Sequence, residues 1–441
     1  MARTEVTTHG RNWVRLDNAS NIFLAARSEI DPKVFRLSAE MSDDVDPALL
    51  QRALDHTYDR YPLYHAVLRR GIFWYYLQDS DLRPEVALDD QYTCAPLYQV
   101  DRKNLLFRVV YFQRRIVLEV FHALSDGTGA LWFLTDLLVA YAQLRMSGEL
   151  PATDDTLPPH ELSTDSFAEY FFTPAAPLAR EVVEEPSPRT PWTQIHHPRG
   201  TRSADGRTRA VELTMPASEV LALAKAEGVS LTSYLIALFF ESIRAGGLGR
   251  ARTLTASVPV NLRQFFPSTS ARNFFATVRV QHAYTDGETE LGEVCRDIET
   301  QLRAKATQAA MERKVRRLIR FERNPALRIF PRPLKDVILS LINWGNSRGL
   351  TVAISNMGRV VFPEQAEAQV KRLLLHIAPA RPQFCAVSQN GMLTVCFTSP
   401  FVETDHVREY ARLLTGRGVD LMVAATRVTE SEIAEVTNAA M

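Results

Sequence analysis

The sequence has no surplus charge of either sign, because its 441 residues include 51 Lys and Arg against 51 Asp and Glu. Without a basic surplus there is no general attraction for nucleic acid or anionic lipid, so we expect neither as a partner. Cysteine is scarce as well. The four cysteines, Cys94, Cys295, Cys385 and Cys396, form no CxxC pair and have no metal-ligand spacing, so we expect core thiols and no metal site.

Long apolar runs are also missing. Residues 1–17 are polar and lack the hydrophobic stretch of a secretory signal. The longest apolar segments, 131–144 and 231–240, are too short to cross a bilayer, and we expect buried helices there. The sequence thus predicts a cytoplasmic protein without a membrane span. Its hydrophobic content of 46% is enough for a large core.

Several motifs of other enzyme classes are absent. There is no GxSxG elbow, and no cysteine adjoins the histidine motif described below, which disfavours a covalent acyl-enzyme. The glycine-rich stretch 246–249 has neither the GxGxxG form nor a following Lys-Ser/Thr, so we expect a helix cap and a turn. His196 and His197 have no carboxylate or cysteine at ligand spacing, which favours a surface loop over a metal site.

The first part of the chain reads as alternating helices and strands. Asp46-Pro47 and apolar residues at spacings of three and four predict an amphipathic helix up to about Tyr61. Segments 105–111 and 116–121 are β-branched and aromatic, and they predict a hairpin whose second strand ends at His122. Glycines 127 and 129 then end the strand before a helical pattern.

The middle of the chain changes in composition. Residues 151–206 are rich in Pro, Thr, Asp and Ser, with little periodicity. We interpret them as a crossover and predict an N-terminal lobe at 1–155, a linker at 156–206 and a C-terminal lobe at 207–441. In the second lobe, the pattern predicts strands at about 208–213, 253–259, 274–281, 351–355, 383–387 and 393–398, with helices from 217 and 231 and a basic helical tract up to about 335. This alternation suits α/β layers.

The stretch Phe121-His122-Ala-Leu-Ser-Asp126-Gly127 carries the candidate chemistry. An imidazole titrates near neutrality, so a histidine fixed where a strand meets a turn can accept a proton from an attacking hydroxyl or amine. The Gly127 amide at the helix start has the chemistry to donate to a developing oxyanion. A purely structural alternative remains open at this point, with His122 satisfied at a strand end and Asp126 as the helix N-cap.

A second copy of the pattern lies in the other half of the chain. His282-Ala-Tyr-Thr-Asp286-Gly287 also spells HxxxDG, after a predicted strand and before the amphipathic segment 291–302. The repetition suggests two pseudo-symmetric lobes, of which only one need carry chemistry.

Four segments together resemble the condensation-domain-like superfamily of CoA- and carrier-dependent acyltransferases, which includes alcohol acetyltransferases and stand-alone condensation domains. The likeness spans about residues 20–400 and rests on Arg60–Arg69, Phe121–Gly127, Val258–Arg263 with Asn273-Phe274 after it, and Ile354–Gly358. The motif has Phe121 where many condensation domains place another histidine, which favours ester formation. No DFGWG-type signature is present, so the plant-like subgroup is disfavoured.

The resemblance implies an α/β fold of the α+β sandwich type, with two chloramphenicol-acetyltransferase-like lobes and an active-site tunnel between them. It implies His122 as general base for direct acyl transfer, Asp126 paired with Arg263, and His282 as a structural counterpart. The residues it assigns are His122, Asp126 and Gly127 in the catalytic motif, with Arg263, Asn273, Ser355 and Asn356 as support.

The function that the resemblance implies is transfer of an acyl group from a CoA thioester to an alcohol, by a monomer without a tightly bound cofactor. Two alternatives stay open: a carrier-protein-dependent condensation enzyme that forms an amide or ester from an acyl-carrier phosphopantetheine, and a catalytically silent binding protein of the same fold. The acceptor is a small-molecule alcohol or amine in either enzyme.

The tract 301–335 contains eleven Lys or Arg against Glu312 and Glu322. A solvated helix face explains this excess, whereas a dock for CoA phosphates or an acidic carrier protein is the functional alternative. Arg316 and Arg317 are the candidate donor-binding residues.

Overall fold

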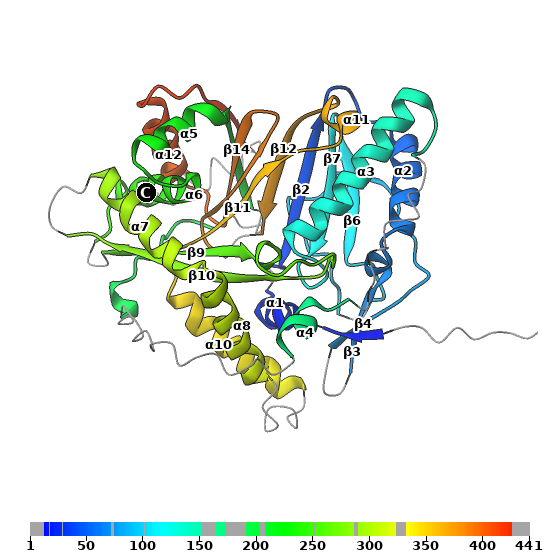
Figure 1. Ribbon diagram of the computed structural model, residues 1–441, viewed down its shortest axis with the longest axis horizontal. Helices are drawn as coiled ribbons and strands as arrows, with labels where there is room; N and C mark the ends of the chain where they lie inside the picture. The colour runs from blue at the N-terminus through cyan, green and yellow to red at the C-terminus, as the bar shows by residue number, and fades with distance from the viewer. Residues whose placement is uncertain are drawn as a thin grey trace, which may run out of the picture.

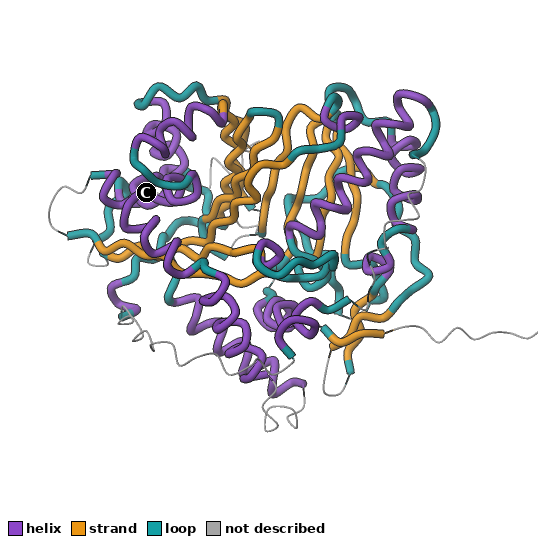
Figure 2. The backbone as a smooth tube through the Cα atoms, in the orientation of Figure 1, coloured by secondary structure: helices purple, strands orange, loops and turns teal. Residues whose placement is uncertain are grey.

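The structure is a computed structural model. It describes residues 13–16, 18–28, 30–71, 75–100, 102–151, 160, 162, 164–172, 191–202, 208–249, 252–285, 290–322, 332–378 and 380–425. Its strands form sheets of five, seven and three strands, and helices pack on the two larger sheets (Figures 1 and 2). The architecture is α+β with two sheet-rich lobes.

The five-stranded sheet carries the first histidine motif. In spatial order its strands are β12 (Val370–Ile377), β2 (Val34–Met41), β7 (Arg115–Phe121), β6 (Phe107–Phe112) and β5 (Ala87–Leu88). The predicted hairpin is β6 and β7, and its turn places Gln113 at φ 49°, a left-handed conformation. Strand β7 is buried from Ile116 to Phe121, and most of its apolar residues belong to the first hydrophobic core.

Helices α2 (Pro47–Asp59) and α3 (Gly127–Ser147) pack against each other and against this sheet (Figure 1). The predicted caps of α2 are present, since the Asp46 side chain accepts from the amides of Ala48 and Leu49. Helix α3 begins at the motif glycine Gly127 and ends at Gly148, which has φ 77°. The histidine motif therefore joins the central strand of one lobe to its longest helix.

The seven-stranded sheet forms the second lobe. Its spatial order is β10 (Phe275–Ala283), β9 (Thr253–Asn261), β11 (Val352–Val360), β13 (Gln383–Gln389), β14 (Met392–Ser399), β8 (Arg209–Pro216) and β15 (Met422–Ala425). β11 runs parallel to β9 and β13, whereas the other pairs are antiparallel. Helices α5 (Ala217–Ala226), α6 (Leu231–Arg244), α7 (Leu291–Lys305) and α12 (Asp405–Thr415) complete a second hydrophobic core.

The sheets of the two lobes meet through strands and ion pairs. β12 lies in the five-stranded sheet, although it follows β11 of the other sheet in the chain. Arg115 on β7 makes a two-bond ion pair with Glu212 on β8, with N–O distances of 3.0 and 2.9 Å. The two lobes are thus joined by a strand that follows β11 in the chain but belongs to the five-stranded sheet, and by a partly buried charge pair. The predicted boundaries at 155 and 206 stay predictions.

Smaller elements flank the site. Helix α1 (Asn18–Ala26) contacts α10 (Arg332–Arg348) and α8 (Gln308–Glu322), and α4 (Ser166–Phe171) also packs on α8. The third sheet comprises β1 (Trp13–Arg15), β4 (Tyr75–Gln78) and β3 (Val67–Arg70). The other short elements are η1 (Pro62–His65), η2 (Trp192–Gln194), η3 (Leu262–Gln264) and α11 (Glu364–Glu367).

Most predicted elements are present, and some were missed. The basic tract is divided between α7, α8 and α10 instead of forming one helix, and β12, α12 and β15 had not been predicted. All four cysteines are buried free thiols, as expected. Within the described ranges no single helix has the length and hydropathy of a membrane span, while α5 and α6 would qualify only as a pair bent by 85°.

Candidate active site

The loop from His122 to Asp126 is held at the junction of the lobes. The His122 amide donates to the carbonyl of Lys33 at 2.8 Å, which extends the β2–β7 pairing by one residue. Lys33 has φ 59°, so the chain turns immediately beyond this contact. The backbone around His122 is thereby fixed by neighbouring strands before any side-chain contact is considered.

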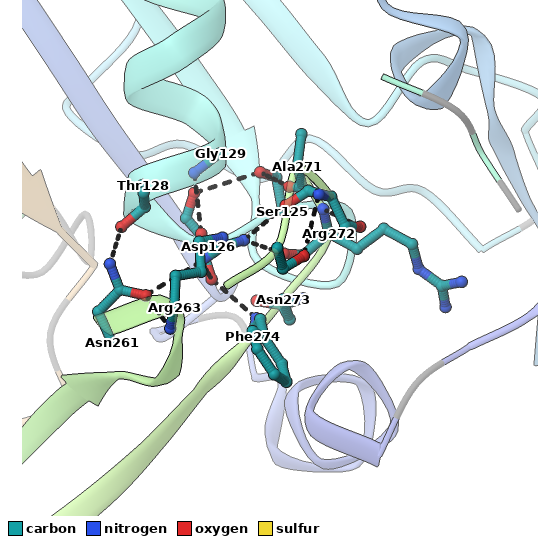
Figure 3. Close-up of polar contacts among 12 residues, drawn as sticks. Ser125, Asp126, Thr128, Gly129, Asn261, Arg263, Ala271, Arg272, Asn273 and Phe274 are labelled. Atoms are coloured by element: carbon teal, nitrogen blue, oxygen red, sulfur yellow. Dashed lines mark hydrogen bonds and ion pairs between the residues drawn. The ribbon is translucent and has the colours of Figure 1, made fainter. Parts of the chain in front are cut away.

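The Asp126 side chain accepts three hydrogen bonds, as Figure 3 illustrates. Oδ1 caps α3 by accepting from the Gly129 amide at 2.9 Å. Oδ2 accepts from Arg263 Nη1 at 2.7 Å and from the Phe274 amide at 2.8 Å. The N-cap role and the pairing with Arg263 were set out as separate interpretations, and the structure contains both.

Arg263, in η3 after β9, organises the residues that precede β10. Its Nη2 donates to the carbonyls of Ser270 and Arg272 at 2.8 and 2.6 Å, and its guanidinium lies 5.2 Å from the Trp132 ring centroid. The side chains of Arg263 and Asp126 are only 6% and 7% exposed, so this is a buried ion pair. We call the segment that Arg263 holds the 270–274 loop. Through this loop, lobe two contacts the histidine motif.

Gly129 lets this loop approach α3 closely. A Cβ at Gly129 would overlap the carbonyl oxygen of Ala271 and would lie 2.5 Å from Ser125 Oγ. That same hydroxyl donates to the Ala271 carbonyl at 2.6 Å (Figure 3). The second glycine of Gly127-Thr-Gly129 is therefore needed for inter-lobe packing and not only for ending a strand.

The His122 ring lies among aromatic side chains from three elements. Phe23 of α1 stacks on it with ring centroids 4.0 Å apart, while Phe35 of β2 and Phe275 of β10 lie at 5.0 and 5.7 Å. These rings limit the orientations open to the imidazole. The residue itself remains partly exposed, so it is not sealed in the interior.

Hydrogen bonds determine which ring nitrogen of His122 carries the proton. The Asn273 amide donates through Nδ2 to the His122 carbonyl at 2.8 Å and to Ser20 Oγ at 3.0 Å, which leaves Oδ1 as the atom facing His122 Nδ1 at 3.2 Å. An amide oxygen can only accept, so Nδ1 carries the proton. Nε2 then bears the lone pair, and no described residue hydrogen-bonds to it.

Burial lowers the pKa of His122 from its ordinary value of 6.5, and this effect exceeds the opposing influences of Asp126 and the Asn273 hydrogen bond. The imidazole is therefore neutral at neutral pH. A neutral ring with a free Nε2 lone pair is the form that accepts a proton.

The remaining predicted support residues lie in different surroundings. Gly127 is the first residue of α3, and a Cβ there would lie 3.7 Å from Met357 of β11. Asn356 of β11 donates to Thr232 Oγ1 at 3.0 Å and accepts from the Gly358 amide at 2.8 Å, at an irregularity in the strand. Ser355, next to it, is partly exposed. β11 thus borders the start of α3, whereas the predicted tunnel remains a prediction.

The second histidine motif is built differently. His282 lies near the end of β10 and is paired through Nδ1 with Asp297 Oδ2 of α7 at 2.7 Å. It is 7% exposed, and Tyr284 packs edge-on against it at 4.7 Å. The predicted amphipathic segment is α7, while Asp286 and Gly287 lie outside the described residues.

The two candidate donor-binding arginines also differ. Arg316 donates to Glu312 at 2.8 Å within α8 and to the Phe171 carbonyl of α4 at 3.3 Å, so it holds two helices together. Arg317 is exposed on α8. His197 is exposed and His196 partly so, and the described residues contain no group of three or more His, Cys, Asp or Glu side chains suited to a metal ion.

Three residues of the site were not identified from the sequence. Ser20 and Phe23 belong to α1, and Ser125 lies within the motif at a position that HxxxDG leaves unspecified. A serine and a phenylalanine near the N-terminus carry no local signal for a contact more than 100 residues away. Ser125 had a weak signal, since a small polar residue before an N-cap is common.

The fold and the histidine motif braced by lobe two define a class, the two-lobed condensation-domain-like fold of chloramphenicol-acetyltransferase type. Solved structures share it over nearly their whole length. Polyketide synthase associated protein 5 from Mycobacterium tuberculosis aligns at a TM-score of 0.60 and 14% identity, covering 92% of this chain and 98% of its own. TRI101 from F. graminearum, complexed with coenzyme A and T-2 mycotoxin, aligns at 0.60 and 11% identity, covering 92% and 97%.

TRI3 trichothecene 15-O-acetyltransferase from Fusarium sporotrichioides aligns at a TM-score of 0.58 and 12% identity, covering 94% of this chain and 97% of its own. No protein-family model matches the sequence, and no curated protein matches it. At these identities the likeness shows the fold, and the predicted fold class and structural resemblance are confirmed.

Proposed function

We propose that this protein is an acyltransferase that moves an acyl group from a CoA thioester to an alcohol, with His122 as general base. One observation carries the proposal: Asn273 Oδ1 lies 3.2 Å from His122 Nδ1. Because this oxygen can only accept, it favours the proton on Nδ1 and leaves the Nε2 lone pair for chemistry at the junction of the lobes. The likeness to TRI3 and to TRI101 with its bound coenzyme A supports the same reaction class.

The transfer is direct. Nε2 of His122 takes the proton of the acceptor hydroxyl as its oxygen attacks the thioester carbonyl, and a tetrahedral oxyanion forms. The carbon–sulfur bond then breaks, the carbonyl re-forms, and the imidazolium returns the proton to the leaving thiolate. The products are an ester and a free thiol, and no covalent acyl-enzyme forms.

The start of α3 supplies electrostatic support. Amides in the first turn of a helix have no intrahelical acceptor, and Asp126 already satisfies that of Gly129. We assign the Gly127 amide as the donor to the developing oxyanion, at the positive end of a 21-residue helix. Asp126 does not act on substrate, because both its carboxylate oxygens are occupied.

The donor is acyl-CoA, and the acceptor is a small-molecule alcohol. The basic helix α8 suits a phosphate-bearing donor, and exposed Arg317 is its candidate contact. Arg317→Glu is expected to raise the KM for acyl-CoA severalfold, and more strongly at low salt, with kcat unchanged. Arg320→Glu, another exposed position on α8, is the matched control. Equal effects of both variants would indicate general steering instead of a dock.

The test of the function is thiol release from acyl-CoA with a panel of alcohols and amines. Release with alcohols supports the proposal if it is lost in His122→Ala while the far-ultraviolet circular dichroism is unchanged. Release only with amines, or only from an acyl-carrier phosphopantetheine, would favour a condensation enzyme. No release with any donor, together with tight binding of acyl-CoA, would indicate a silent binding protein.

A further inference from the structure

The Asn273 amide has two orientations with nearly the same shape and opposite chemistry. In the orientation present, Oδ1 faces His122 Nδ1. After a 180° flip the amide would present N–H groups to that nitrogen, and the ring would have to carry its proton on Nε2 instead. In that tautomer Nε2 has no lone pair and the ring cannot act as the base. The orientation of this amide therefore bears directly on the competence of His122 as a base, beside the contact of the ring with its own backbone.

Two groups fix the amide, and one of them comes from α1. The His122 carbonyl accepts one Nδ2 proton at 2.8 Å, and Ser20 Oγ accepts the other at 3.0 Å. The hydroxyl proton of Ser20 is itself donated, at 2.8 Å, to the carbonyl of Ala123. Its lone pairs are thus turned towards the amide.

This arrangement is buried and directional. Ser20 is 0% exposed and Asn273 2% exposed, so water does not readily replace either partner. The chain of donors runs from Asn273 through Ser20 to Ala123, and each carbonyl in it can only accept. A flipped amide would set its oxygen against the His122 carbonyl, and Ser20 could donate to that oxygen only by giving up its bond to Ala123, so the two contacts reinforce each other.

We infer that Ser20 is a positioning residue for the base: its hydroxyl holds the Asn273 amide in the orientation that keeps His122 protonated on Nδ1. The inference rests on the proposed function, because the tautomer matters only if His122 accepts a proton. It also gives α1 a role in the site beyond packing. The same helix carries Phe23, which stacks on the imidazole, so α1 restrains both the ring plane and its proton.

The first test reads the tautomer without any substrate. In full-length protein with ¹⁵N-labelled histidine, two-bond proton–nitrogen correlations distinguish a proton on Nδ1 from one on Nε2, and His122→Gln identifies the resonance among the ten histidines. We expect wild-type His122 to carry its proton on Nδ1 at pH above its lowered pKa. A wild-type ring protonated on Nε2 would overturn the inference.

The second test removes the hydroxyl. Ser20→Ala is expected to add a population of His122 rings protonated on Nε2. It should also lower kcat about tenfold with little change in KM, because a tenfold change corresponds to the loss of one well-placed hydrogen bond. Ser242→Ala is the matched control, since that serine is 1% exposed and its hydroxyl donates within α6 to the Phe239 carbonyl at 2.8 Å. An unchanged tautomer and kcat in Ser20→Ala would contradict the inference.

Two outcomes separate this inference from the proposed function. If wild-type protein shows no acyl transfer, yet has the Nδ1-protonated ring and loses it in Ser20→Ala, the function fails and the positioning role stands. If Ser20→Ala is poorly folded, Asn273→Leu replaces it: losing the oxygen should release the ring to both tautomers. A ring still held as the Nδ1 form in Asn273→Leu would overturn the inference.

Discussion

The two HxxxDG motifs place a histidine near the end of a strand in each lobe, yet the two rings have different partners. His122 Nδ1 meets a neutral amide, Asn273, that arrives from the other lobe. His282 Nδ1 meets a carboxylate, Asp297, on the next helix of its own lobe. His122 is also ringed by three aromatic side chains and partly exposed, whereas His282 is 7% exposed.

The difference shows that the motif alone does not determine the partners of its histidine. In lobe one the 270–274 loop delivers the Asn273 side-chain oxygen, the Ala271 carbonyl and the Phe274 amide to the motif. In lobe two a local hydrogen bond between His282 of β10 and Asp297 of α7 joins a strand to the next helix. The pair of lobes is pseudo-symmetric in sequence and asymmetric in chemistry.

The largest difference between the two motifs should appear when the histidine of each is replaced by alanine. His122→Ala is expected to lower kcat by about 10²- to 10⁴-fold, the usual contribution of a positioned base, with the fold retained. His282→Ala should keep most of the activity and lose only stability. Steady-state thiol release from acyl-CoA is the measurement. Equal loss of activity in the two variants would break the comparison and place chemistry in both motifs.

The next effect concerns the two aspartates that serve the motifs. Asp126→Ala leaves Arg263 buried and unpaired, so we expect a loss of about 3–5 kcal/mol in the free energy of unfolding. Asp297 has a side chain that is 41% exposed, so Asp297→Ala should cost less than about 1 kcal/mol. Urea denaturation followed by fluorescence compares them. A loss for Asp297→Ala as large as that for Asp126→Ala would refute the assigned difference.

Gly129 offers a test of the inter-lobe contact with a smaller expected effect. The corresponding position in the second motif is Thr289, so the two motifs differ here as well. Gly129→Ala should force the 270–274 loop away from α3 and destabilise the protein by about 1–3 kcal/mol. Activity should fall as well, since Asn273 belongs to the displaced loop. Gly148→Ala, at the far end of α3 with φ 77°, is the control for glycine loss without a loop contact. Wild-type stability and activity in Gly129→Ala would contradict the packing role.

The smallest effect is a displacement of the pH profile. Burial holds the pKa of His122 below 6.5, and only the neutral ring accepts a proton. The value of kcat/KM should therefore be flat through pH 7 and fall only as the pH drops through that lowered pKa. His282→Ala should leave the midpoint unchanged. A midpoint above pH 6.5 would mean that an acidic neighbour, and not burial, has the larger effect on the pKa of His122.

Much of the local structure could be predicted from the sequence. The cap Asp46, the hairpin of β6 and β7, and the glycines at the start of α3 are local signals, so these features were found within a few residues. β12 was missed because its residues, Lys371 and Arg372 among them, mix charge with apolar residues in a strand that pairs with β2 over a separation of more than 300 residues. Non-local pairing of this kind leaves little trace in a short window.

The candidate site was predicted unevenly. His122 and Asp126 are specified by the motif, and Arg263 and Asn273 came from resemblance to a family pattern. The structure contains the predicted contact of Asp126 with Arg263. The contact of Asn273 with His122 had not been predicted. Ser20 and Phe23 could not be predicted, because a buried hydroxyl and an aromatic ring in an N-terminal helix have many alternative partners. Arg316 was grouped with Arg317 on charge alone, and the structure separates them by their contacts.

The sequence by itself determined the strand–turn–helix unit that presents His122, since caps, glycines and apolar periodicity act over a few residues. Only the tertiary structure decided which nitrogen of that ring is left as a base. The position of the proton depends on the Asn273 amide, 151 residues away, and on the Ser20 hydroxyl, about 100 residues away. The direction of hydrogen bonds between such distant segments is determined by tertiary packing and not by local preference.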